Sequence, residues 1–162
     1  MEIYHTIYKG GDGEIVEKKS RFIAEVHPVT SEEEAMEILE QTRKQYWDAR
    51  HHCWAYIIGR NPAAERMSDD GEPAGTAGKP ILEVIRGREL TNVLVIVTRY
   101  FGGIKLGTGG LVRAYSSSIS QALKVATLTT VTTLQEYQIH FSYDLIGKID
   151  HYFRTQNIEV IE

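Results

Sequence analysis

A glycine-rich, cationic stretch restricts the fold of this chain more than any other part of the sequence. It spans residues 99–113 and reads RYFGGIKLGTGGLVR. An apolar run at residues 93–97 precedes it, and the segment that follows has the spacing of a helix. Glycine allows left-handed backbone and close approach of other groups, and free N–H groups ahead of a helix attract anions. The order of strand, glycine-rich loop and helix therefore predicts a site for a phosphate, a carboxylate or an acidic partner surface.

The spacing within this glycine-rich stretch differs from both common phosphate-binding motifs. A P-loop requires a Gly-Lys-Ser/Thr triplet and a dinucleotide fingerprint requires a third glycine at a fixed offset, and the stretch contains neither. The alternative is a tight turn whose glycines serve only the close packing of a strand against a helix. The residues expected to bind an anion or a partner are Arg99, Tyr100, Gly102, Gly103, Lys105, Gly107 and Arg113.

A second unusual segment, the acidic loop (residues 68–80), combines carboxylates with glycines and prolines. Asp69, Asp70 and Glu72 are oxygen ligands of the kind that a hard cation takes. Their spacing is not that of an EF-hand. The alternatives are an acidic surface loop that pairs with the cationic stretch and a helix cap at Thr76. We therefore predict no metal site for these residues.

A third cluster is the sequence HHCW at residues 51–54. Adjacent residues of a strand point to opposite faces, so His51 and Cys53 are expected on one face and His52 and Trp54 on the other. The spacing of zinc ligands is missing. Cys53 is either an inert buried thiol or a nucleophile with a histidine base, and one histidine is expected to line a pocket. The residues expected to line a cleft are His51, His52, Asp69, Asp70, Glu72 and Thr76.

Together these motifs resemble the YigZ/IMPACT family, which is defined by the Impact N-terminal domain. The matching segments are KSRFIA at 19–24, HHCWAY at 51–56, DDGEPAGTAG at 69–78 and RYFGGIKLG at 99–107. The similarity runs from about residue 13 to about residue 123. Two positions depart from the family pattern: Arg50, where a small polar residue is expected, and Ala74, where serine is frequent. Arg50 adds a charge near the histidines.

The resemblance implies a mixed α+β fold. Residues 1–128 are expected to form a two-layer α/β domain, which in this family is similar to the second domain of a small-subunit ribosomal protein. Bacterial members of the family add a ferredoxin-like α+β domain. Residues 129–162 would form only the start of that domain, so the second domain looks truncated.

Periodicity and capping signals predict the individual elements. Strands are expected at residues 4–8, 14–29, 53–58 and 92–100, helices at 32–46, 78–87 and 109–126, and turns at 10–13 and 59–64. Thr30 and Ser31, followed by three glutamates, mark the start of the first helix. Strand formers are frequent at 127–134. Beyond them the pattern predicts strands at 137–143 and 157–161 on either side of a helix at 144–156.

Composition excludes several classes of protein. The net charge of −4 disfavours a surface coated with basic residues, although Arg86, Arg88, Arg99, Lys105 and Arg113 leave room for a local cationic patch. The single cysteine allows no internal disulfide, which is typical of a reducing cytosol. We find no apolar run of the roughly 20 residues that a membrane span needs, and no signal-peptide pattern. A cytoplasmic protein is therefore expected.

Two functional hypotheses follow. The resemblance implies a non-catalytic binding protein linked to translation regulation, because eukaryotic relatives regulate translation through a partner of the amino-acid-starvation kinase. Its expected partner is RNA, the ribosome or a translation-associated protein, contacted through the glycine-rich stretch, with no cofactor and no membrane. The alternative is a small-molecule or nucleotide-binding enzyme. Its cleft would use Asp69 or Asp70 as base or metal ligand, a histidine as acid and Lys105 as an anion clamp.

Overall fold

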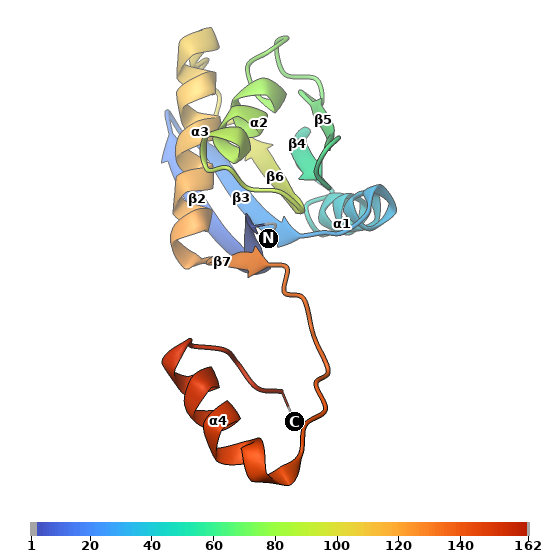
Figure 1. Ribbon diagram of the computed structural model, residues 1–162. Helices are drawn as coiled ribbons and strands as arrows, with labels where there is room; N and C mark the ends of the chain where they lie inside the picture. The colour runs from blue at the N-terminus through green and yellow to red at the C-terminus, as the bar shows by residue number, and fades with distance from the viewer. Residues whose placement is uncertain (1–2, 162) are drawn as a thin grey trace.

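A computed structural model describes residues 3–161 (Figure 1). Its strands are β1 (Ile3–Lys9), β2 (Gly11–Glu17), β3 (Ser20–Pro28), β4 (His51–Ile58), β5 (Ala64–Ser68), β6 (Val93–Tyr100) and β7 (Thr127–Thr132). Its helices are α1 (Glu32–Gln45), α2 (Gly78–Gly87), α3 (Gly107–Val125), the 3-10 turn η1 (Tyr143–Leu145) and α4 (Ile146–Thr155). No helix in the described part of the chain is both long enough and apolar enough to span a bilayer.

The centre of the fold is a five-stranded antiparallel sheet in the order β2-β3-β6-β4-β5. The middle strand, β6, is buried from Val93 to Arg99, which agrees with the interior strand expected at 92–100. No strand was expected at the edge strand β5, because its segment AERMS has no clear apolar alternation. A second sheet pairs β1 with β7.

Alternation along the strands divides the core between the two faces of the sheet. Cys53, Ala55 and Ile57 of β4 pack in the cluster that includes buried residues of α2 and α3. Trp54 and Tyr56 pack on the other face, with α1. The mixed α+β class is confirmed, as is the predicted separation of His51 and Cys53 from His52 and Trp54. We expected a domain of two layers, and α1 forms a third layer on the second face of the sheet.

The first helix begins where its capping residues predict. The backbone N–H of Glu34 donates to Ser31 Oγ at 3.1 Å, and the N–H of Thr30 donates to the Glu34 carboxylate at 2.8 Å. This reciprocal arrangement satisfies the N–H of Glu34, which the helix leaves unpaired, and the N–H of Thr30, just before the cap. Three glutamates in the first turn add a favourable interaction with the helix dipole.

Two predictions at the N-terminal end were wrong. Residues 11–13 belong to strand β2, not to a turn: a Cβ on Gly13 would overlap the Ala122 backbone, so glycine here lets α3 lie directly on the strand. The single strand expected at 14–29 is divided by a turn at Lys18 and Lys19, whose φ angles are 44° and 65°. Lysine rarely adopts this left-handed conformation, so the sequence carries no turn signal.

Several connections meet at one end of the central sheet. Glu17 pairs with Ser20 beside the Lys18–Lys19 turn, and Tyr100, the last residue of β6, lies opposite Arg21. His51, the first residue of β4, lies opposite Arg99. The Lys18–Lys19 turn, residues 46–50, the acidic loop and residues 101–106 therefore gather here. We call this place the loop end of the sheet.

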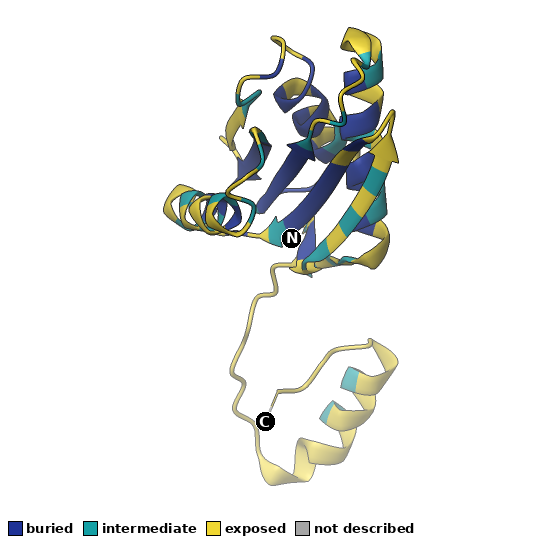
Figure 2. Cartoon of the chain, turned by 180° about the vertical axis from the view of Figure 1, so that it is seen from behind, coloured by how far each residue is buried: buried dark blue, intermediate teal, exposed yellow. Residues whose placement is uncertain are grey.

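The C-terminal segment differs from its expected pattern. Thr127–Thr132 pairs with β1, so this strand pairing crosses the domain boundary expected at residue 128. Residues 137–143 and 157–161 contain no strand, and none of residues 133–161 is buried (Figure 2). Only the helix expected at 144–156 forms, as η1 and α4. A ferredoxin-like second domain stays a prediction.

Candidate functional site

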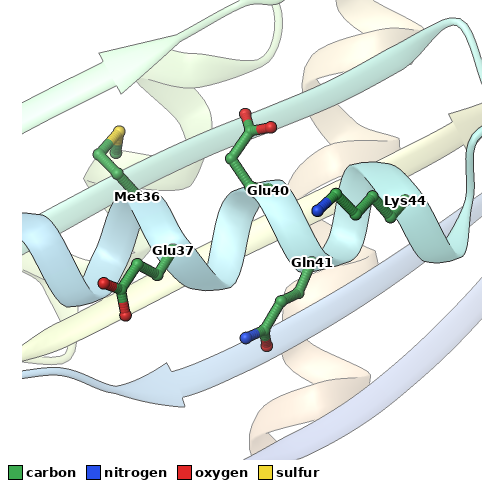
Figure 3. A pocket seen from close by; sticks show the side chains of 5 residues that line it. All are labelled: Met36, Glu37, Glu40, Gln41 and Lys44. Atoms are coloured by element: carbon green, nitrogen blue, oxygen red, sulfur yellow. The ribbon is translucent and has the colours of Figure 1, made fainter.

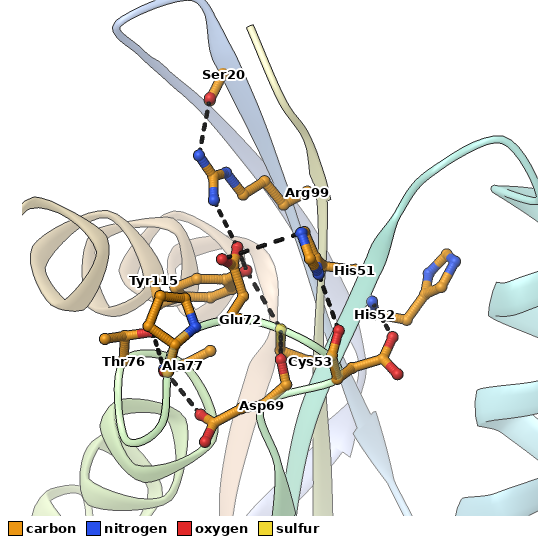
Figure 4. Close-up of polar contacts among 12 residues, drawn as sticks. Ser20, His51, His52, Cys53, Asp69, Glu72, Thr76, Ala77, Arg99 and Tyr115 are labelled. Atoms are coloured by element: carbon orange, nitrogen blue, oxygen red, sulfur yellow. Dashed lines mark hydrogen bonds and ion pairs between the residues drawn. The ribbon is translucent and has the colours of Figure 1, made fainter. Parts of the chain in front are cut away.

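A buried polar network links three of the sequence motifs at the loop end of the sheet (Figure 4). Arg99 of β6 donates from Nη1 to Glu72 Oε1 at 2.7 Å. The hydroxyl of Tyr115, on α3, donates to the same oxygen, also at 2.7 Å. All three residues are buried. The glutamate of the acidic loop is therefore held between the central strand and the longest helix.

Ser20 ties the glycine-rich stretch into the same network. Its Oγ accepts from Arg99 Nη2 at 3.3 Å and from the backbone N–H of Gly102 at 3.1 Å. A Cβ on Gly102 would overlap the backbone of Lys19, so only glycine allows this approach. The glycine-rich stretch is thereby fixed against the turn between β2 and β3.

The sequence led us to expect Arg99 on the surface with the other cations of the glycine-rich stretch. In the structure Arg99 is buried. Its guanidinium carbon is 5.4 Å from the ring centre of Phe22 and 5.5 Å from that of Phe101. Its Nε is buried and has no hydrogen-bond partner among the described residues. A side chain enclosed in this way by Glu72, Ser20 and two rings is a structural cation, and it is not available to contact a phosphate.

Asp69 organises the acidic loop. Its carboxylate accepts hydrogen bonds from the backbone N–H groups of Gly75, Ala77 and Gly78 at 2.8–3.1 Å. Burial raises the pKa of Asp69, but these three N–H groups outweigh burial, and the net shift is below the usual value. Asp69 thus caps α2, whereas Thr76, where we expected a cap, is buried and donates from Oγ1 to the Pro73 carbonyl.

The two histidines do not share a cleft. His51 Nδ1 is 2.8 Å from the Asp70 carbonyl, and its Nε2 is 4.0 Å from Glu72 Oε2 (Figure 4). His52 lies on the opposite face, where its Nδ1 is 3.2 Å from Thr98 Oγ1. Burial lowers the pKa of His52, with the charge of Asp70 acting in the opposite direction. Of the predicted cleft residues, His51 therefore lies against the acidic loop, whereas the side chain of His52 is on the opposite face of the sheet.

Cys53 has the features of an inert buried thiol. Its Sγ is 3.0 Å from the Asp69 carbonyl and 3.2 Å from the Tyr115 hydroxyl. Burial raises the pKa of Cys53, and likewise that of Tyr115, far above their usual values. A thiol held protonated in this way is a poor nucleophile. Among residues 3–161, no group of three or more His, Cys, Asp or Glu side chains is arranged to hold a metal ion.

The remaining predicted site residues lie at or near the surface. Gly103, Lys105, Gly107 and Arg113 are exposed. Tyr100 is partly buried and donates from its hydroxyl to Asp48 Oδ1 at 2.8 Å. Tyr115 and Ser20 have no predicted site role: Tyr115 lies within the helix expected at 109–126, and Ser20 lies within the family motif at 19–24.

Two surface depressions lie away from this network. One is formed by a single helix, α1, and is lined by Met36, Glu37, Glu40, Gln41 and Lys44 (Figure 3). The other lies between β1, β7 and the end of α2, and is lined by His5, Arg88, Leu90, Leu128, Thr129 and Thr130. Neither contains a predicted site residue.

Comparison with known families agrees with the placement of these motifs. The family model described as the Impact N-terminal domain matches residues 18–123, which include the acidic loop and the glycine-rich stretch. The chain belongs to this family. It is 44% identical over 154 residues to the IMPACT family member YvyE of Bacillus subtilis, covering 95% of this chain and 71% of the relative.

Other Impact family relatives are bacterial and eukaryotic. The chain is 43% identical over 135 residues to the IMPACT family member YigZ of Escherichia coli, covering 82% of this chain and 66% of the relative. It is 30% identical over 141 residues to the Protein IMPACT homolog of Dictyostelium discoideum, covering 85% of this chain but 39% of the relative. All three of these relatives are longer than the part that the chain matches.

Solved structures confirm the fold class. A crystal structure of a hypothetical protein aligns with a TM-score of 0.78 at 37% identity, covering 100% of this chain and 80% of the other. The two-domain translational regulator Yih1 aligns with a TM-score of 0.51 at 27% identity, covering 74% of this chain and 48% of Yih1.

Proposed function

We propose that this chain is a non-catalytic binding protein linked to translation, and that it contacts RNA, in the first place ribosomal RNA, through the glycine-rich stretch. Membership of the Impact family and the likeness to a structure described as a translational regulator support the link to translation. Both are analogies, and the choice of RNA rests on the surface of the molecule itself.

One observation carries the proposal: Glu72, Tyr115 and Cys53 are buried, whereas Lys105 and Arg113 are exposed. Arg99 and Tyr115 both donate hydrogen bonds to Glu72, and Cys53 is a buried thiol. What the motif presents to solvent is a cationic loop. Such an arrangement suits recognition of a surface more than turnover of a substrate.

Lys105 and Arg113 are the exposed cations of the glycine-rich stretch. Within residues 3–161 neither forms an ion pair. They flank the first turn of α3, which begins at Gly107 and has no side-chain cap, so its N–H groups remain open to an acceptor. Lysine, arginine and helix N-termini are the usual phosphate contacts of nucleic-acid-binding proteins, and they fix position more than sequence.

The competing enzyme hypothesis needs Asp69 or Asp70 as base or metal ligand, one histidine as acid and Lys105 as anion clamp around one cleft. His51 and His52 face opposite sides of the sheet, and Glu72 is occupied by Arg99 and Tyr115. Asp69 is likewise bound by three N–H groups. These residues therefore do not come together as the base, acid and anion clamp that the enzyme hypothesis needs.

Co-sedimentation with bacterial ribosomes tests the proposal. Wild-type protein is expected to pellet at low salt and to be released at higher salt, since each phosphate contact releases counterions. Replacing Lys105 and Arg113 together by alanine should abolish pelleting. The matched control replaces Lys9 and Lys124, both exposed near the other end of α3, and should pellet like wild type.

Two results would contradict the proposal. One is pelleting that is insensitive to salt and unchanged in the Lys105 and Arg113 double variant, which would indicate a protein partner bound elsewhere. The other is a concentration-dependent rise of the melting temperature with a nucleotide or small metabolite, since only a ligand of the native state stabilises in this way.

A further inference from the structure

Trp47 is an exposed tryptophan next to the glycine-rich stretch. It follows α1, and 80% of its surface is exposed, whereas Trp54, the other tryptophan, is 6% exposed. A large exposed indole is unusual on a soluble domain unless it meets a partner. Building on the proposed function, we infer that the loop end of the sheet binds single-stranded nucleic acid, with Trp47 stacking on a base.

A hydrogen bond joins the residue after Trp47 to the glycine-rich stretch. Asp48, the next residue, accepts from the Tyr100 hydroxyl at 2.8 Å. Burial and then the Asp48 hydrogen bond raise the pKa of Tyr100, so the hydroxyl remains a donor at neutral pH. Phe101, which follows Tyr100, is about half exposed. The fold thus brings a second exposed aromatic ring to the end of the sheet that carries Trp47.

The Lys18–Lys19 turn adds cations to the same end of the sheet. Both lysines are exposed, and neither forms an ion pair within the described residues. Gly102 packs directly against the backbone of Lys19, which places this turn beside the glycine-rich stretch. Lys18, Lys19, Lys105 and Arg113 thus lie on two adjoining segments that are far apart in sequence.

Most carboxylates at this end already accept hydrogen bonds. Asp48 is bound to Tyr100, Asp69 to backbone N–H groups and Glu72 to Arg99. Asp70 accepts from the N–H of His52 at 2.7 Å. Glu17 is the exposed carboxylate beside the lysine turn. The exposed cations Lys18, Lys19, Lys105 and Arg113 outnumber the exposed carboxylates Glu17 and Asp48. The loop end is therefore a local cationic surface on a chain whose net charge is −4, and it complements a polyanion.

The combination of rings and cations favours a single strand over a duplex. Proteins that hold single strands combine a cationic track with aromatic side chains on which unpaired bases stack. In a duplex the bases already stack on one another, so an exposed indole gains nothing while the cations still find phosphates. The role of Trp47 therefore separates the two forms of nucleic acid.

Tryptophan fluorescence of the full chain measures this directly. Oligouridylate of about 12 nucleotides, within the length that such surfaces occupy, should quench the emission of exposed Trp47, while buried Trp54 provides a constant background. Binding measured by anisotropy of labelled oligouridylate should weaken about 5- to 150-fold in Trp47→Ala, because stacking on one base contributes about 1–3 kcal/mol. Trp47→Phe should retain much of the affinity.

Charge and aromatic controls accompany these variants. Replacing Lys18 and Lys19 by alanine should reduce the slope of log K against log salt by about 1.4, or roughly 0.7 for each phosphate contact. Replacing Lys9 and Lys124 should leave the slope unchanged. Tyr8→Ala removes an exposed ring on β1, beside the C-terminal end of α3, and should bind like wild type.

The outcomes separate this inference from the proposed function. Ribosome pelleting that depends on Lys105 and Arg113, combined with oligouridylate binding that Trp47→Ala leaves unchanged, overturns the inference and leaves the proposed function standing. Pelleting without binding of oligouridylate, or tighter binding of a matched duplex, also overturns the inference. Absence of both pelleting and oligouridylate binding overturns the inference and the proposed function together.

Discussion

Arg99 and Glu72 form an ion pair with both partners buried: Nη1 is 2.7 Å from Oε1, and the side chains are 6% and 3% exposed. The pair joins the central strand to the acidic loop, and Tyr115 completes it from α3. In this fold the two most conspicuous charged motifs of the sequence therefore bind each other. Their first role is to hold the loop end of the sheet together.

Arg99→Ala is expected to destabilise the protein by about 3–5 kcal/mol, because it leaves the Glu72 carboxylate buried without its counter-charge. Adding Glu72→Gln to that variant should recover part of the loss, since the uncompensated charge disappears. Urea unfolding of the two single variants and the double variant gives the coupling energy. Additive single effects would show that the pair contributes nothing beyond its separate residues.

Asp69→Asn should lower stability by about 1–2 kcal/mol at neutral pH, because an amide is a weaker acceptor for the N–H groups of Gly75, Ala77 and Gly78. Since folding lowers the pKa of Asp69, its contribution is present above the ordinary value of 3.8 and is lost as the pH falls through the folded value.

The stability difference between wild type and Asp69→Asn should therefore narrow in acid. Unfolding in urea at neutral pH and at about pH 3 measures it. The control is Asp144→Asn, an exposed carboxylate of the C-terminal segment, which should change stability little at either pH. A difference that stayed constant with pH would show that the charge of Asp69 is not what caps α2.

Gly102→Ala should destabilise the protein by about 1–3 kcal/mol or more, because the added methyl group would overlap the Lys19 backbone. Gly87→Ala is the matched control: an added Cβ at Gly87, at the end of α2, meets no atom within 4 Å. Thermal unfolding compares the two. Equal melting temperatures for both variants would mean that the glycine-rich stretch is not fixed against the lysine turn.

Removal of residues 133–162 should change the melting temperature of the first domain very little, because no residue from 133 to 161 is buried. Removal from residue 127 onward should be more harmful, because it takes away β7 and leaves β1 unpaired. Limited proteolysis should cut between 133 and 142 first. Early cleavage in the glycine-rich stretch would contradict this order of stability.

Much of this protein could be predicted from short stretches of sequence. The start of α1 after Ser31 and the separation of Cys53 from Trp54 follow from rules that involve only a few neighbouring residues. The three motifs were sufficient to indicate the family. Capping and alternation work at this level because the backbone groups and side chains concerned are neighbours along the chain.

Other features depended on tertiary structure. The Lys18–Lys19 turn has left-handed angles that its residues do not signal, and the burial of Arg99 could not be inferred from a position beside exposed glycines. The hydrogen bond between Tyr100 and Asp48 joins the end of β6 to the segment after α1, and these lie close together only because of the order of strands in the sheet. That order is set by burying both faces of the sheet at once, and this requirement involves the whole domain, whereas periodicity and capping involve only one segment at a time.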